Sequence, residues 1–279
     1  MDYIELNIPV ADAAQAEIVV AELAELPFES FATEGGLLKA YIPQDRLIDC
    51  KEQADELMQR CGIRGARYVQ IESQNWNQLW ESNFQPVDID GRVLVRAPFH
   101  PAGNGCGMEI VIMPKMSFGT GHHATTCLMV RAILDLAPLD GRRVLDMGCG
   151  TGILAIAAAK CGAAAVDAVD IDEWAAENCR ENVRDNATAD RTEVLQGDIS
   201  AVAGRRYDLI LANINRNILL HDMAAYARLL DSGGHLIVSG FLDSDICALR
   251  QGASACGLHP AAEYHRDGWS ALVFKQPVS

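Results

Sequence analysis

The spacing of apolar and polar residues in the first quarter of the chain predicts four strands and two helices. Residues 3–8 alternate and predict a strand, and the helix that follows ends before Pro27 and carries apolar residues at helical spacing: Ala16, Val19, Val20, Leu23 and Leu26. Strands at 28–33 and 37–42 flank a turn at Gly35-Gly36, and a second helix leads to a strand at 67–71. One face of this second helix is expected to hold Ile48, Ala54, Leu57, Met58 and Cys61. The order predicts a small α+β domain of the ferredoxin-like type at residues 1–73.

The pattern changes over residues 74–115, which we interpret as a connector. Trp76, Trp80 and Phe84 recur every four residues, so they share one face of a short helix. We interpret them as an aromatic stripe that packs against a domain rather than as a ligand site. Two strand-like segments, 93–96 and 108–113, flank a glycine-rich loop around 103–105.

Strands and helices alternate over residues 116–279, which predicts an α/β domain with helices on both faces of its sheet. We expect a Rossmann-like, mostly parallel, seven-stranded sheet whose last strand is antiparallel. The clearest strand segments are 143–147, 165–170, 192–196, 209–213, 235–238 and 269–274, and a helix is expected near 243–256.

A glycine-rich turn, residues 146–152, follows the strand at 143–147 and opens an apolar helix that Gly162 can cap. Gly148 and Gly150 allow a close approach of the main chain to a ligand, and the helix start offers free amide donors. A dinucleotide fingerprint would place its third glycine at position 153, where this chain has Ile153. The D-x-G-x-G-x-G spacing that starts at Asp146 is instead the usual methyltransferase form, and it predicts S-adenosylmethionine as cofactor. Asp146 is expected to accept from the cofactor's amino group or to order water near it.

Polar residues end the next three strands at the edge where α/β sheets bind ligands. Asp170 is expected to grip both ribose hydroxyls, and Asp172 to cap the helix that follows. Asp198 is either an acceptor for the adenine amine or a turn residue. Asn213 is expected to face the methyl group, where its carbonyl orients a nitrogen nucleophile. We therefore predict a nitrogen methyltransferase with Asn213 as its catalytic residue.

A loop rich in glycine and hydroxyl groups, residues 116–126, precedes the first helix of this domain. We expect it to close over the cofactor, with Thr120 among the cofactor contacts. His122 and His123 are adjacent and have no third metal ligand at useful spacing, so no metal site is expected.

The composition and net charge of the chain limit the kinds of molecule that it is expected to bind. The formal charge of −15 and the lack of a basic cluster argue against nucleic-acid binding and suit a basic partner. The sequence shows neither a long apolar run nor a signal peptide, and its nine cysteines form no C-x-x-C pair. We expect a cytoplasmic protein, monomeric and without membrane contact.

These motifs resemble those of the ribosomal protein L11 methyltransferase family, PrmA-like class I enzymes that methylate the stalk-base protein of the large ribosomal subunit. The resemblance spans nearly the whole chain and rests on segments 76–84, 118–126, 146–152, 170–172 and 212–214. It implies that S-adenosylmethionine contacts Thr126, Gly148, Asp170 and Asn213. It also implies a protein-lysine N-methyltransferase that modifies lysine and amino-terminal nitrogens of L11, which its amino-terminal domain recognises.

One departure and two alternatives remain open. The chain has His122-His123-Ala124 where many members have threonine, histidine and proline, which leaves the shape of the loop open. A nitrogen methyltransferase for RNA or a small molecule is the first alternative, because an asparagine after the fourth strand also serves adenine and amide acceptors. A binding module that keeps the fold without transfer is the second. The acidic charge disfavours RNA, and Asp146, Asp170 and Asn213 disfavour the binding module.

Overall fold

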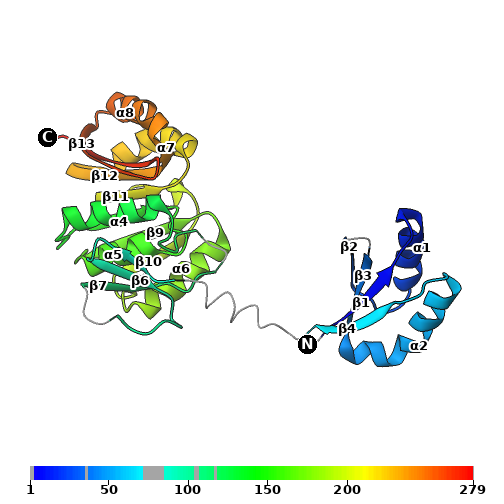
Figure 1. Ribbon diagram of the computed structural model, residues 1–279. Helices are drawn as coiled ribbons and strands as arrows, with labels where there is room; N and C mark the ends of the chain where they lie inside the picture. Colours follow the sequence, from blue (N-terminus) through cyan, green and yellow to red (C-terminus); the bar gives the residue numbers. More distant parts are fainter. Residues whose placement is uncertain (1–2, 35–36, 72–84, 104–106, 116–117, 279) are drawn as a thin grey trace. The chain divides into compact units, whose positions relative to one another are not determined.

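The chain forms two compact units, Met1–Asn83 and Phe84–Ser279, which are described separately (Figure 1). The computed structural model describes residues 3–34, 37–71, 85–103, 107–115 and 118–278. The predicted aromatic stripe at 76–84 and parts of the loops around 104 and 116 therefore lie outside the described residues. The division into a recognition domain at 1–73, a connector at 74–115 and a catalytic domain at 116–279 stays a prediction.

The first unit has the predicted ferredoxin-like order. It consists of β1 (Tyr3–Pro9), α1 (Ala13–Leu23), β2 (Ser30–Glu34), β3 (Leu37–Pro43), α2 (Gln44–Arg60) and β4 (Arg67–Ile71). The antiparallel sheet has the order β2-β3-β1-β4. Alternate residues of β1 and β3 are buried in one cluster with apolar side chains of both helices, so α1 and α2 cover the same face.

The prediction for Ile48 was wrong. Its side chain is 81% exposed, whereas Cys50, Ala54, Leu57 and Met58 form the buried face of α2. At about 100° per residue, Ile48 lies about 120° around the helix from Ala54, which places it outside the buried stripe.

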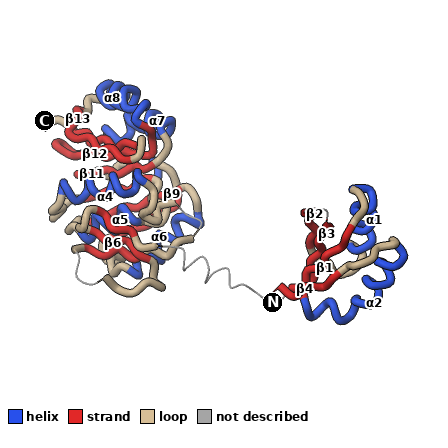
Figure 2. Tube along the Cα trace, viewed as in Figure 1, coloured by secondary structure: helices blue, strands red, loops and turns tan. Residues whose placement is uncertain are grey.

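The second unit is built on the predicted seven-stranded sheet, and the predicted Rossmann-like fold is confirmed. Its strand order is β10-β9-β8-β11-β12-β14-β13, and Figure 2 shows the strands of this unit in red and its helices in blue. The strands are β8 (Arg143–Met147), β9 (Ala165–Asp170), β10 (Thr192–Gln196), β11 (Tyr207–Asn213), β12 (Leu230–Leu242), β13 (His259–Arg266) and β14 (Trp269–Lys275). The first five are parallel to one another, and β14 runs antiparallel to both β12 and β13.

Helices cover both faces of this sheet. Among the described residues of this unit, the α-helices are α4 (Ala124–Leu136), α5 (Ile153–Lys160), α6 (Glu173–Asp185), α7 (Arg216–Leu229) and α8 (Ile246–Ala255), and the short 3-10 helices are η1 (Ile199–Val202) and η2 (Asp243–Asp245). Leu209 and Leu211 of β11 are buried with α4, α5 and α6, whereas Ile210 and Ala212 are buried with α7 and α8. A parallel strand buried on both faces is a continuous apolar run, which is why this strand was predictable.

A small sheet belongs to the second unit. It has the order β5-β6-β7, with β5 (Val87–Ile89), β6 (Val93–Arg96) and β7 (Met108–Val111). Apolar side chains of all three strands are buried in the same core as α4 and α5. The segment that follows β7 contacts α6, because the Met113 amide donates to Asn182 Oδ1 at 2.8 Å.

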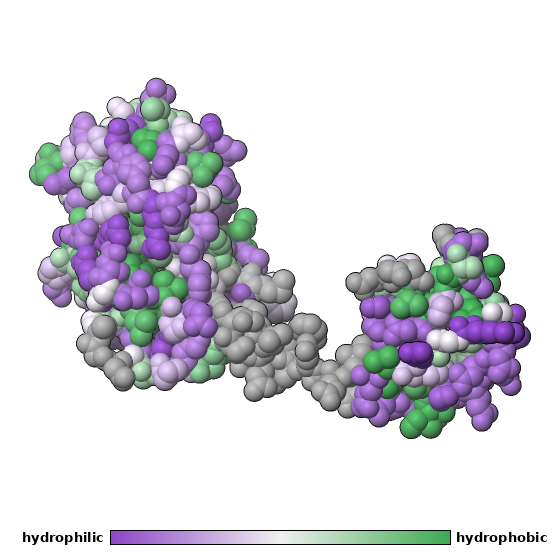
Figure 3. Space-filling model, viewed as in Figure 1, coloured by the Kyte–Doolittle hydropathy of each residue, from purple (hydrophilic) through white to green (hydrophobic). Residues whose placement is uncertain are grey.

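Both units show largely polar residues on the face drawn in Figure 3, with apolar side chains scattered between them. In the part of the chain that the structure describes, none of the helices combines the length and apolar character that a membrane span requires.

A buried polar network lies at the amino end of β11, opposite the edge at which Asn213 ends this strand. Asp167 is 5% exposed and accepts a hydrogen bond from the Tyr207 hydroxyl at 2.5 Å, and its carboxylate lies 2.8 Å from the Arg205 guanidinium. A buried carboxylate is stable only with such partners, so this network links the start of β11 to β9 across the intervening strand β8.

We expect Tyr207→Phe to lower the free energy of unfolding by about 1–3 kcal/mol, because Asp167 then loses one donor in a buried site. Urea denaturation measures this loss. Tyr264→Phe is the matched control, since the Tyr264 hydroxyl donates to Asp135 at the surface and its removal should cost less than about 0.5 kcal/mol. Equal losses in the two variants would contradict the role of the buried network.

Candidate functional site

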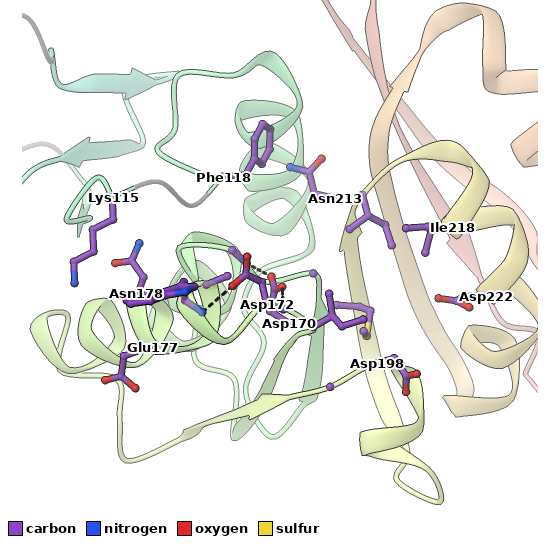
Figure 4. Close-up of a pocket in the computed structure, with 18 of the residues that line it drawn as sticks. Lys115, Phe118, Asp170, Asp172, Glu177, Asn178, Asp198, Asn213, Ile218 and Asp222 are labelled. Atoms are coloured by element: carbon purple, nitrogen blue, oxygen red, sulfur yellow. Dashed lines mark hydrogen bonds between the residues drawn. The ribbon is translucent and has the colours of Figure 1, made fainter. Parts of the chain in front are cut away.

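A cavity of about 1060 Å³ opens at the carboxyl ends of the parallel strands. Its wall includes five residues predicted from the sequence: Gly148, Gly150, Asp170, Asp198 and Asn213. Figure 4 shows the carboxylates at 170 and 172 near the middle, with Asn213 and Asp198 on one side and Lys115 and Asn178 on the other. The strand ends thus bring these polar groups together as the sheet topology requires.

Main-chain hydrogen bonds fix the glycine turn to the end of β9. The amides of Gly148 and Cys149 both donate to the carbonyl of Val169, at 2.8 and 3.0 Å, and the Gly150 amide donates to Asp170 Oδ2 at 2.8 Å. These hydrogen bonds to Val169 and Asp170 of β9 therefore fix the conformation of the glycine turn.

Glycine is required in this turn because of protein neighbours. Gly148 and Gly150 have φ values of +72° and +54°. A Cβ at position 148 would lie 2.3 Å from Ile214 Cγ2, and one at position 150 would lie 2.3 Å from the Phe118 carbonyl oxygen. The structure shows a close approach of these glycines to two other segments of the chain, and the predicted close approach to a ligand stays a prediction.

Asp170 is held in place by two main-chain amides. Its Oδ2 accepts from Gly150 and its Oδ1 from the Asp172 amide at 3.0 Å. Each oxygen keeps a further lone pair for a ligand hydroxyl. Asp172 accepts from the Trp174 amide at 2.8 Å and begins α6, so its predicted role as an N-cap is confirmed.

Asp146 is fully buried and lies outside the cavity wall. Its Oδ2 accepts from the Ala155 amide at 3.0 Å, and its Oδ1 has no hydrogen-bond partner among the described residues. Burial raises the pKa of this carboxyl to about 7, against a lowering by the Ala155 hydrogen bond, and the charge of Asp170 adds a smaller rise. A cationic or donating group near Oδ1 would restore the carboxylate.

Asn213 ends β11 and lines the cavity with an unused acceptor. Its Oδ1 atom is buried, and no described residue donates to it. A buried acceptor without a partner costs about 1–3 kcal/mol, so the position favours a ligand that brings an N–H group.

The two threonines predicted as cofactor contacts, Thr120 and Thr126, do not line the cavity. Thr126 is buried on α4, and its hydroxyl has no partner among the described residues. Thr120 lies in the loop before α4, 3.3 Å from His122 Nδ1, and neither threonine belongs to the cavity wall. The predicted contact of Thr120 with the cofactor stays a prediction.

His123 has a structural position. Its Nδ1 caps α4 by accepting from the Thr125 amide at 3.3 Å, and its ring lies between those of Phe118 and Trp269, with centroids 5.3 and 4.8 Å away. The described residues contain no group of three or more side chains suited to a metal ion.

Asp198 has the turn role that the sequence left open, and its contact with the adenine amine stays a prediction. Its Oδ1 accepts from the Ser200 amide at 2.9 Å and from the Ser200 hydroxyl at 2.6 Å, which starts η1. The hydroxyl lowers the pKa of the carboxyl more than the amide does. The same side chain lines the cavity, where it presents a charged acceptor.

Sequence reasoning missed most of the apolar wall. Phe118, Ile171, Trp174 and Ile218 line the cavity and are 56%, 75%, 83% and 44% exposed. One signal was available, because Ile171 and Trp174 are large apolar residues at a helix start, where polar residues are usual. The remaining wall residues not predicted as site residues include Lys115, Met147, Ala175, Glu177, Asn178, Glu181, Gly197, Ile214 and Asp222.

Comparisons with known proteins agree along nearly the whole chain. Residues 8–277 match the family model described as ribosomal protein L11 methyltransferase (PrmA). Proteins named ribosomal protein L11 methyltransferase from Porphyromonas gingivalis and Bacteroides fragilis are 46% and 40% identical to this chain. The matches cover 92% of this chain in both cases, and 90% and 93% of those relatives.

A solved structure supports the fold. The ribosomal protein L11 methylase of Lactobacillus delbrueckii subsp. bulgaricus is similar, with a TM-score of 0.61 and 24% identity. The match covers 70% of this chain and all of that chain.

The raised pKa of Asp146 predicts a pH-dependent stability of the unliganded protein. In the unfolded chain the pKa of this carboxyl returns to about 3.9. The contribution of Asp146 to the free energy of unfolding is therefore complete below about pH 3.9 and is lost as the pH rises through about 7. Relative to Asp146→Asn, the wild type should lose up to about 1.4 kcal/mol per pH unit between about pH 5 and pH 7. Urea denaturation of both proteins over this range checks the slope, and parallel curves would contradict it.

Proposed function

Because the chain belongs to the ribosomal protein L11 methyltransferase family, we propose that it transfers methyl groups from S-adenosylmethionine to lysine and amino-terminal nitrogens of ribosomal protein L11. The observation that carries the proposal is the unpartnered acceptor of Asn213, placed beside the glycine turn in a chain that matches this family from residue 8 to 277.

The polar groups of the site fit S-adenosylmethionine. Asp170 has lone pairs for the ribose hydroxyls, and Asp198 has a charged acceptor for the adenine amine. Buried oxygens of Asp146 and Thr126 have no hydrogen-bond partner among the described residues, and we assign the missing partner to a cofactor amino group or an ordered water. We therefore assign Asp146, Gly148, Gly150, Asp170, Asp198 and Asn213, together with Thr126, to cofactor binding.

Positioning dominates the chemistry of this chain's own residues. When bound, S-adenosylmethionine supplies an electrophilic methyl group on a sulfonium sulfur. Asn213 Oδ1 accepts an N–H of the acceptor nitrogen and so directs its lone pair. The side-chain amide of Asn213 is not acidic enough to protonate the acceptor nitrogen, so the lone pair of this nitrogen stays available for attack.

The acceptor must reach the site as a free amine. A lysine side chain has a pKa of about 10.4, and partial desolvation among Phe118, Ile214 and Ile218 lowers it by disfavouring the ammonium. We assign proton removal to water, because Asn213 cannot act as a base.

We assign recognition of the ribosomal protein to the first unit. Its sequence through Ser73 holds fourteen Asp and Glu residues against six Lys and Arg residues. Such a surface attracts a basic protein and repels the phosphates of RNA.

Methyl transfer to purified L11 tests the proposal. With radiolabelled S-adenosylmethionine, label should enter L11 and not ribosomal RNA, and mass mapping should place it on lysine and amino-terminal nitrogens. Label in RNA alone, or none in L11, would sink the proposal.

We expect Asn213→Ala to lower kcat at least a hundredfold, because it removes the group that orients the nucleophile. A quenched single-turnover assay measures the rate constant of methyl transfer, and circular dichroism shows that the fold persists. Asn217→Ala is the matched control, because Asn217 lies on the exposed surface of α7 close in sequence. Undiminished turnover in Asn213→Ala would exclude the assigned role.

We expect Asp170→Ala to weaken S-adenosylmethionine binding at least tenfold, because the ribose loses a charged acceptor and the Gly150 amide loses its partner. Isothermal titration calorimetry measures the Kd. Asp172→Ala is the comparison, since it removes the cap of α6 and should cost about 1 kcal/mol of stability with a smaller change in Kd. Similar Kd values for Asp170→Ala and the wild type would refute the assignment.

A further inference from the structure

The orientation of one buried amide, that of Asn178 on α6, follows from its neighbours. The Met113 amide donates to Asn182 Oδ1 at 2.8 Å, so the Asn182 amide group must turn its Nδ2 the other way. That Nδ2 donates to the Thr151 carbonyl at 2.9 Å and to Asn178 Oδ1 at 3.3 Å. Asn178 therefore presents its own Nδ2 on the remaining side.

Among the described residues, this Nδ2 is a donor without a partner. Asn178 is 1% exposed, and its Nδ2 makes no hydrogen bond with any described residue. The residue nevertheless lines the cavity, and Figure 4 shows its amide directed away from α6, toward the segment that carries Lys115. A buried donor of this kind costs about 1–3 kcal/mol until an acceptor reaches it.

The wall around Asn178 is a distinct part of the cavity, which we call the α6 arm. It is formed by Lys115, Phe118, Trp174, Ala175, Glu177, Asn178 and Glu181. In Figure 4, Asp170 and Asp172 lie between Lys115, Glu177 and Asn178 on one side and Asp198 on the other, and Phe118 lies near Asn213. The arm thus extends from the groups assigned to the cofactor along α6. The whole cavity, at about 1060 Å³, is as large as the upper end of the range for a single small ligand, about 1,000 Å³.

We propose that the α6 arm binds a peptide segment of the protein substrate beside the acceptor nitrogen, and that Asn178 Nδ2 donates to a main-chain carbonyl of that segment. This inference rests on the proposed function, because it needs a protein acceptor.

The chemistry of the arm favours a neutral carbonyl next to basic side chains. An anionic ligand group in the arm would lie near the carboxylates of Asp172, Glu177 and Glu181. The one cationic side chain in the described wall of the arm, Lys115, is already paired with Glu181. A peptide carbonyl carries no charge, and lysine side chains around it would meet these acidic groups favourably. The exposed rings of Phe118 and Trp174 offer apolar surface to the aliphatic stems of such side chains.

Steady-state methylation of L11 by the whole chain tests the proposal. We expect Asn178→Ala to raise the KM for L11 about tenfold, the effect of losing about 1.4 kcal/mol, with kcat and the Kd for S-adenosylmethionine within about twofold of wild type. Asn178→Leu, which keeps most of the volume, should behave in the same way and serves if the alanine variant is unstable. Direct titration of L11 into each protein gives a readout that does not depend on turnover.

Asn186→Ala is the matched control on the same helix. Both polar ends of Asn186 are used by the Val111 main chain, at 2.9 and 2.6 Å, so its loss should lower stability without raising the KM for L11. An unchanged KM in Asn178→Ala, or a weaker S-adenosylmethionine Kd with an unchanged KM, would overturn the peptide subsite while transfer by the wild type persists. Absence of transfer by the wild type would instead refute the proposed function itself.

Discussion

The carboxylate of Asp170 is the junction on which the site depends. One oxygen accepts the Gly150 amide of the glycine turn, and the other accepts the Asp172 amide, one residue before α6 begins. A strand end, a turn and a helix start are thereby fixed to a single charged group, and charge-assisted hydrogen bonds to main-chain amides are among the stronger ones. Any ligand that uses the free lone pairs of Asp170 meets a group that is already oriented.

A second set of contacts places the loop before α4 on this junction. The Thr151 amide donates to the Phe118 carbonyl at 2.9 Å, and the Thr151 hydroxyl donates to the Gly119 carbonyl at 2.6 Å. On the other side, Asn182 of α6 accepts from the main-chain amide at 113, and Asn186, the C-cap of α6, accepts from the amide at 111. The small sheet, the loop and α6 therefore meet around one turn, which explains why the most distinctive motifs of the sequence are distant along the chain.

The sequence predicted what local chemistry determines. Apolar runs marked β8, β9 and β10 to the residue, and Asp172 was identifiable as a cap because a helical pattern follows it. The edge strand β13 carried no such signal, since most of its residues are exposed and no alternation is visible. Contacts between residues that are distant in the sequence could not be predicted from local patterns. The clash that forbids a side chain at Gly150 involves Phe118. The orientation of the Asn178 amide, whose Nδ2 has no partner among the described residues, follows only from its contact with Asn182 and from that of Asn182 with Met113.

The contact between Gly150 and Phe118 has a consequence for how such a chain can change. The backbone of the loop at 118–119 lies where a side chain at 150 would stand, so neither segment has room to vary alone. A change in loop conformation that moved Phe118 away would leave the turn uncovered, and a larger residue in the turn would push the loop off. The two segments should thus be inherited as a matched pair, and grafting a loop from a distant relative should succeed only together with its own turn.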